Sequence, residues 1–248
     1  MSEKTWTAAL LVIGDEILSG RTQDANIQYL ATWLNGEGVV LSEVRVVPDV
    51  TERIVDAVNA LRASYDYLFT TGGIGPTHDD ITADAVAKAF NLPLIEHPEA
   101  LARLGAYYTT DEDFTPARRR MTRVPKGGSL IDNSISIAPG FQVENTFVMA
   151  GIPKVMQAML TSLKGQISGG KPRVSRSVTF QTVESGIARP LEDIQNMHEG
   201  ISLGSYPFLK GKKPHVQIVI TGTDEALVET VQRAVRSLGT PIEESDCD

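Results

Sequence analysis

The sequence has a single cysteine, no long apolar run and no excess of basic charge. Its cysteine, Cys247, is the penultimate residue, so an intrachain disulfide is excluded and a reducing, cytoplasmic location is expected. No apolar stretch approaches the ~18 residues that a membrane helix needs. Lys and Arg number 23 against 31 Asp and Glu, which gives a net charge of −8. Because phosphate backbones require basic surface, neither nucleic acid nor a membrane is an expected partner.

What is present is an alternation of short apolar runs with segments of helical spacing. Strands are expected over residues 8–13, 39–47, 65–71 and 146–150, and helices over residues 24–34, 51–63, 82–90, 98–108 and 153–163. This order is typical of an α/β fold with three layers, in which helices cover both faces of a mostly parallel sheet.

The pattern changes after residues 166–172, which have the composition of a linker. Strand, helix, strand, strand and helix then follow, which predicts a small α+β domain. The expected organisation is therefore a large domain over residues 1–167, a small domain over residues 172–242 and a disordered polar tail over residues 243–248.

A glycine-rich turn separates the third strand from its helix: Thr-Thr-Gly-Gly-Ile-Gly-Pro-Thr-His-Asp-Asp-Ile-Thr, residues 70–82. Gly72, Gly73 and Gly75 leave the backbone free to adopt positive φ, and such a turn can direct several N–H groups at an anion. A tight turn with a helix cap is the alternative interpretation for a lone Gly-Gly-x-Gly. The adjacent Asp79 and Asp80 favour a ligand site, because they suit a phosphate bridged by a metal ion.

Helix capping is expected at the end of this turn. Thr82 is the candidate N-cap of the following helix, with Asp80 as its competitor. Either choice places both carboxylates at the positive end of a helix, where they should stay ionised. Thr51 is likewise expected to be the N-cap of the helix that ends at residue 63.

A second acidic turn follows the first strand. Gly14 is followed by Asp15 and Glu16, and Asp49 comes after the second strand. Turns that follow parallel strands gather at one edge of the sheet, so the carboxylates of the first and third turns should meet there. They would suit Mg²⁺ or Mn²⁺, with Co²⁺ as a further candidate. The alternative is a solvated loop in which an acid caps a helix, and Asp49 also suits a plain turn.

Other polar residues have weaker signals. Asp24 and Asn26 are ordinary capping residues at the start of the first helix, although Asn26 could also reach the same edge. His78 has no second histidine near it in the sequence, so a zinc site has little support. The arginines at positions 118–120 and 123 could hold a pyrophosphate, but such a run is more often a solvated face.

The segment Thr-Gly-Gly-Ile-Gly-Pro-Thr-x-Asp-Asp-Ile-Thr resembles the signature of the MoaB/Mog molybdopterin-binding domain family. Three other segments are similar to family motifs: residues 13–20, residues 138–141 and Ala150-Gly151-Ile152-Pro153, in which alanine replaces a usual proline. Gly204-Ser205-Tyr206-Pro207 resembles the small domain of the CinA and FAD synthase branch, and the two acids after His78 also favour that branch.

The resemblance implies a fold that binds a nucleotide or pterin phosphate at the sheet edge, and a homodimer or homotrimer. The candidate ligand-binding residues are Gly14, Asp49, Gly72, Gly73, Gly75, Thr77, Gly151 and Pro153. The candidate metal ligands are Asp15, Glu16, Asp79 and Asp80, of which Asp79 and Asp80 are also the candidate catalytic residues.

Three functions are consistent with these residues. The first is a divalent-metal-dependent hydrolase that splits dinucleotide pyrophosphates of the ADP-ribose or FAD type. The second is molybdopterin binding, with or without adenylyl transfer in cofactor assembly. The third is a module that binds nucleotides without reacting. The 248 residues contain neither an FAD-forming domain nor an amidase domain, so neither activity is expected.

Overall fold

The computed structural model describes residues 4–108, 110 and 112–242, which divide into two compact units after Gly170. The predicted tail and Cys247 lie outside the described residues. Among the residues described, no helix is both long and apolar enough to span a bilayer.

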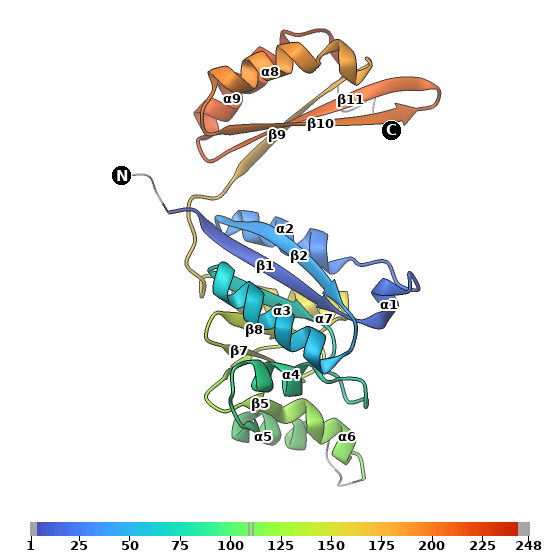
Figure 1. Ribbon diagram of the computed structural model, residues 1–248, viewed down its shortest axis with the longest axis vertical. Helices are drawn as coiled ribbons and strands as arrows, with labels where there is room; N and C mark the ends of the chain where they lie inside the picture. The colour runs from blue at the N-terminus through green and yellow to red at the C-terminus, as the bar shows by residue number, and fades with distance from the viewer. Residues whose placement is uncertain (1–3, 109, 111, 243–248) are drawn as a thin grey trace. The chain divides into compact units, whose positions relative to one another are not determined.

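The first unit is built on a six-stranded sheet with the order β2-β1-β3-β8-β7-β6 (Figure 1). Its strands are β1 (Trp6–Ile13), β2 (Val39–Val47), β3 (Tyr67–Thr71), β6 (Ser129–Ile131), β7 (Gly140–Val143) and β8 (Thr146–Met149). The first four in spatial order are parallel to one another, whereas β7 pairs antiparallel with β8, and β6 pairs antiparallel with β7. The expected α/β fold with a mostly parallel sheet is confirmed.

Helices cover both faces of this sheet and create two separate cores. One face packs on α3 (Thr51–Ser64) and α4 (Thr82–Ala89), and the other packs on α2 (Asn26–Gly36) and α7 (Pro153–Ser162). The apolar residues of α3 recur at helical spacing, which explains why one stripe of the helix is buried. The remaining elements lie around this frame: α1 (Asp15–Leu18), β4 (Leu94–Glu96), α5 (Pro98–Tyr107), α6 (Pro116–Arg119), the 3₁₀ turn η1 (Arg120–Thr122) and β5 (Arg123–Pro125).

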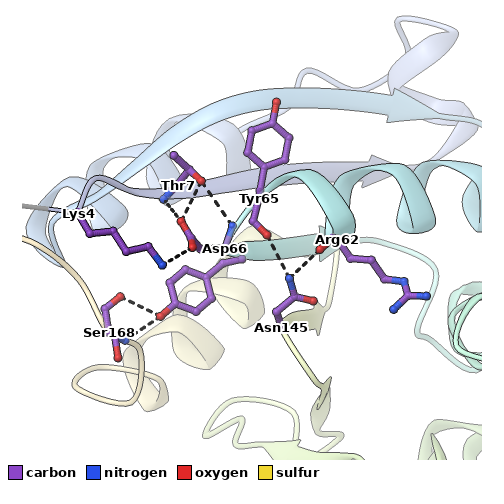
Figure 2. Close-up of polar contacts among 8 residues, drawn as sticks. Lys4, Thr7, Arg62, Tyr65, Asp66, Asn145 and Ser168 are labelled. Carbon is purple, nitrogen blue, oxygen red and sulfur yellow. Dashed lines mark hydrogen bonds and ion pairs between the residues drawn. The ribbon is translucent and has the colours of Figure 1, made fainter.

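The amino edge of the parallel sheet is fastened by polar contacts (Figure 2). The carboxylate of Asp66 accepts hydrogen bonds from the backbone N–H and the hydroxyl of Thr7, at 2.9 and 3.0 Å, and Lys4 Nζ lies 2.6 Å from its other oxygen. The side-chain amide of Asn145 donates to the carbonyl oxygen of Arg62 at 3.0 Å. These contacts tie the starts of β1, β3 and β8 together.

The segment with linker composition is partly bound to the first unit. Ser168 exchanges two hydrogen bonds of 2.9 Å with the hydroxyl of Tyr67, and Gly170 N donates to Gly38 O at 3.0 Å. A methyl group on Gly169 would lie 1.7 Å from Glu37 O, so the backbone approaches closer than any other residue would permit. Composition predicted a connection here, but this packing depends on tertiary contacts.

The second unit is a four-stranded antiparallel sheet with the order β10-β11-β9-β12. Its elements are β9 (Val174–Phe180), the 3₁₀ turn η2 (Glu184–Gly186), α8 (Ala188–Met197), β10 (Ile201–Lys210), β11 (Lys213–Gly222), α9 (Glu225–Arg236) and β12 (Pro241–Ile242). The two helices lie on one face of the sheet (Figure 1) and bury an apolar core of their own. The small α+β fold is therefore confirmed, with β12 as an added edge strand.

Candidate functional site

The candidate site lies at the carboxyl edge of the parallel strands. The turns that follow β1, β2, β3 and β8 gather there because the strand order places these four strands side by side. The end of β1 is joined to the end of β2, since Gly14 N donates to Val47 O at 3.2 Å and Asp15 N donates to Asp49 Oδ2 at 2.9 Å. The sheet thus brings Asp15 and Asp49, 34 positions apart in the sequence, into direct contact.

The glycine turn after β3 packs so tightly that two of its positions require glycine. Gly72 has φ +105°, and a methyl group there would lie 2.1 Å from Ile13 O. Gly73 has φ +67°, and a methyl group there would lie 2.3 Å from the hydroxyl oxygen of Thr82. The backbone of the turn is therefore held against β1 on one side and α4 on the other.

The prediction that Thr82 and Thr51 are helix N-caps is wrong. Thr82 is the first residue of α4 and not its N-cap, and its hydroxyl donates to Gly72 O at 2.9 Å. Thr51 is likewise the first residue of α3, which Val50 precedes without a side-chain cap. In both helices the chain enters from an extended or irregular residue, and the threonine of α4 serves the glycine turn instead.

Asp79 and Asp80 are adjacent in sequence but have different surroundings. The carboxylate of Asp80 turns back and accepts hydrogen bonds from the N–H of Thr77, at 2.7 Å, and from its hydroxyl. Asp79 is exposed, and its pKa lies below the usual value because the Thr77 side chain, which it shares with Asp80, stabilises its charged form, followed by its own N–H and His78. Asp79 is therefore ionised near neutral pH.

The carboxylates at this edge act on one another. Burial raises the pKa of Asp49 above its usual value, the N–H of Asp15 opposes this shift, and the nearby carboxylates of three residues add to the rise. Those residues are Asp15, Glu16 and Asp79. Neither Asp15 nor Glu16 caps α1 by its side chain. The turns after β1, β2 and β3 thus form one acidic patch.

A cage of carboxylates is not present in the described residues. No three His, Cys, Asp or Glu side chains of residues 4–108, 110 and 112–242 come together closely enough to hold a metal ion by themselves. Mg²⁺ is commonly held by one or two carboxylates together with substrate phosphates. The donor set therefore fits a cation that arrives with its phosphate ligand.

The turn after β8 completes the edge. Gly151 packs against the glycine turn, since a methyl group on it would lie 3.2 Å from Gly72 Cα, and Pro153 begins α7 two residues later. The side-chain amide of Asn26, in the first turn of α2, donates to Gly151 O at 2.8 Å. Asn26 was predicted as a capping residue that could also reach this edge, and the structure places it there as the one polar member of the buried face that it forms with Leu30 and Leu34.

The arginine run divides between surface and site. Arg119 forms two hydrogen bonds with Glu96, and Arg123 forms two with Asp84. Arg120 donates to Asp80 O at 3.3 Å, and both Arg120 and Arg123 line a narrow cavity beside the glycine turn. The sequence could not separate these arginines, because their partners come from distant segments.

Comparisons with known proteins cover both units. Residues 9–169 match the family described as "Probable molybdopterin binding domain", and residues 172–242 match "FAD synthase, middle domain". A protein of Pyrococcus abyssi is 30% identical over 96% of this chain and 98% of its own length. A "Probable FAD synthase" of Caenorhabditis elegans is also 30% identical, over 94% of this chain but only 50% of its own length.

The first unit also resembles CinA-type proteins. A CinA-like protein of Citrifermentans bemidjiense is 38% identical over 74% of this chain and 47% of its own length. The solved structure of CinA from Thermoplasma acidophilum is 30% identical, has a TM-score of 0.62 and covers 65% of this chain and 98% of that one. The chain therefore belongs to the molybdopterin-binding-domain family, in the branch where that domain is followed by a FAD synthase-type middle domain.

Proposed function

We propose that this protein is a divalent-metal-dependent hydrolase of dinucleotide pyrophosphates of the ADP-ribose or FAD type. The observation that carries the proposal is the acidic patch of Asp15, Glu16, Asp49 and Asp79 beside a tightly packed glycine turn. An acidic patch repels a bare phosphate, so a phosphate ligand at this edge needs a cation between the two. The FAD synthase-type relatives and middle domain support a dinucleotide as the ligand.

The reaction adds water across the P–O–P bridge. The water oxygen bonds to one phosphorus, the bridging P–O bond breaks, and the bridging oxygen leaves with the other phosphate. ADP-ribose would yield AMP and ribose 5-phosphate. A bound divalent cation would neutralise phosphate charge and acidify the attacking water.

The residues of this edge would divide the work. Asp79, with Asp15 or Glu16, would hold the cation, and the backbone N–H groups of the glycine turn would face phosphate oxygens. Asp49 would accept the proton of the water at Oδ1, because Oδ2 already accepts the Asp15 N–H. Asp80 would shape the turn through Thr77.

The test is hydrolysis of ADP-ribose, FAD and NADH with Mg²⁺, Mn²⁺ or Co²⁺. Asp79→Ala should lower kcat at least tenfold, because it removes an exposed ionised carboxylate without removing any packing. Asp193→Ala, a change to an exposed aspartate on α8, is the matched control and should retain full activity. Metal-independent turnover, or full activity in Asp79→Ala, would overturn the proposal.

Molybdopterin binding is the second candidate, and the family match of residues 9–169 favours it. A pterin that copurifies with the protein, together with no hydrolysis of any dinucleotide, would establish this function in place of the first. Nucleotide binding without turnover and without a pterin would indicate a module that binds but does not react.

A further inference from the structure

Helix α2 presents an amide to the carboxyl edge of the sheet. Its buried residues are Asn26, Leu30 and Leu34, which recur every four positions and so lie on one face. Leu30 and Leu34 pack in the apolar core between the sheet and the helices α2 and α7. Asn26 occupies the end of this face in the first turn of the helix, and only 5% of its surface is exposed.

Only half of the Asn26 amide has a partner. Nδ2 donates to Gly151 O at 2.8 Å, and this bond fixes which end of the amide faces the turn after β8. Oδ1 is buried and accepts no hydrogen bond from the described residues. A buried acceptor without a donor is unusual in a native protein and indicates a partner that the chain does not supply.

A second buried polar group lies on the same face of the sheet. Thr71 pairs in register with Val12 and Met149, and both of these belong to the core between the sheet and the helices α2 and α7. The hydroxyl of Thr71 is buried and has no partner among the residues described. The carboxyl ends of the strands thus have two unsatisfied polar side chains on the side opposite α3 and α4.

The surroundings select the chemistry of the missing partner. Asn26 lies in the first turn of α2, and α7 begins just after Gly151. The positive ends of both helices disfavour a metal cation. An amide oxygen in turn disfavours a phosphate oxygen, since both are acceptors. A neutral donor small enough to reach a buried atom, such as a hydroxyl group, satisfies both conditions.

We propose that Asn26 is a ligand-binding residue whose Oδ1 accepts a hydrogen bond from a sugar hydroxyl of the nucleotide. The site's substrate class is accordingly a pyrophosphate that carries sugar hydroxyls, in preference to inorganic pyrophosphate. This inference rests on the proposed function for the position of the phosphates, which lie at the glycine turn beside Gly151.

The test measures binding by calorimetry with Mg²⁺, for inorganic pyrophosphate and for ADP-ribose in the form of its analogue with a methylene bridge between the two phosphorus atoms, which cannot be hydrolysed. Asn26→Leu keeps the size of the side chain and removes its acceptor, whereas Gln28→Leu changes an exposed residue on the same helix as a control. Asn26→Leu should weaken ADP-ribose binding at least tenfold and leave pyrophosphate binding within about twofold. Gln28→Leu should change neither.

Equal losses for both ligands would show a purely structural role for the bond to Gly151 and would overturn the inference. Unchanged ADP-ribose binding would do the same, because a water molecule would then suffice for Oδ1. If Asn26→Leu fails to fold, deoxy-sugar analogues of ADP-ribose replace the variant: one analogue should bind the wild type at least tenfold more weakly. If all bind equally, the inference is wrong.

The inference and the proposed function can fail separately. Binding is measured without turnover, so a protein that binds ADP-ribose through Asn26 but never hydrolyses it would support the inference and refute the hydrolase. Hydrolysis that Asn26→Leu leaves unchanged in both KM and kcat would support the hydrolase and refute the inference. A wild type that binds no sugar-bearing pyrophosphate would refute both.

Discussion

The two edges of the parallel sheet treat carboxylates in opposite ways. At the amino edge, Asp66 receives a lysine and two hydrogen bonds from Thr7 (Figure 2), and its pKa is lowered, first by Lys4. At the carboxyl edge, Asp49 receives one backbone N–H, and its pKa is raised, first by burial and then by the neighbouring acids. The polar groups of the amino edge therefore stabilise the fold, whereas those of the carboxyl edge have fewer partners within the chain.

The same contrast holds for neutral polar side chains. Asn145 at the amino edge donates to two carbonyl oxygens, those of Arg62 and Tyr65. Asn26 at the carboxyl edge has a buried oxygen without a partner. Because an unsatisfied buried acceptor destabilises a fold, such a group is retained where a ligand compensates for it. The two asparagines therefore differ in the same way as the two aspartates: the one at the amino edge is satisfied by the chain, and the one at the carboxyl edge is not.

The largest expected effect comes from adding one methyl group to the glycine turn at the carboxyl edge. Gly72→Ala places a Cβ 2.1 Å from Ile13 O at φ +105°, so β1 and the turn must move apart. We expect a loss of ~3 kcal/mol or more in the free energy of unfolding, together with loss of ligand binding. Urea denaturation and calorimetry measure the two quantities.

Gly20→Ala is the matched control for this change. Gly20 also has a positive φ, +72°, but a methyl group there would meet nothing within 4 Å. It should cost only the ~1–2 kcal/mol of a left-handed conformation. Equal effects of the two substitutions would show that the close approach at Gly72 contributes nothing.

The second-largest expected effect is a loss of stability at the amino edge. Asp66→Ala removes a carboxylate that Thr7 and Lys4 stabilise, and should lower the free energy of unfolding by about 1.5–3 kcal/mol near pH 7. Because the pKa of Asp66 is lowered in the fold, its contribution is complete above the unfolded pKa and is lost as the pH falls through the folded pKa. The difference between wild type and variant should therefore narrow below pH 3.8. A constant difference would contradict this account.

The contrast between the edges shows how far the sequence alone can lead. Hydrophobic periodicity placed β2 at residues 39–47 as observed, and strand order then placed Asp49 near Asp15. Local patterns could not separate Asp79 from Asp80, because only the folded turn aims the backbone N–H of Thr77 at Asp80 and leaves Asp79 exposed. Nor could they show that Arg120 and Arg123 line the cavity beside this turn.

The buried amide had a signal that was available in the sequence. Asn26 continues the four-residue spacing of Leu30 and Leu34, so a polar residue stands where the helix should be apolar. What the sequence could not supply is the partner of each end of that amide, because Gly151 is 125 positions away. Breaks in an apolar stripe therefore locate a candidate site, and tertiary contacts are needed to say what it binds.

The smallest expected effect sharpens the comparison at Asp49. Asp49→Asn keeps an acceptor for the N–H of Asp15 and removes a charge whose pKa is raised, first by burial and then by neighbouring acids. A raised pKa means that the folded state binds the extra proton, so ionisation costs stability above that pKa. The variant should therefore be slightly more stable than wild type near pH 7, by no more than ~0.5 kcal/mol after solvent screening. The gain should disappear below pH 3.8.

Bound Mg²⁺ should reduce the advantage in stability that Asp49→Asn has over wild type. Thermal melts with and without Mg²⁺ and ADP-ribose should show a smaller rise in Tm for Asp49→Asn than for wild type, because a cation at the acidic patch relieves the repulsion that the substitution has already removed. Asp66→Ala serves as the opposite control: it should start from a lower Tm and gain as much as wild type from the ligand. If Asp49→Asn is less stable than wild type without metal, the acids of this edge do not repel one another, and the contrast between the two edges fails.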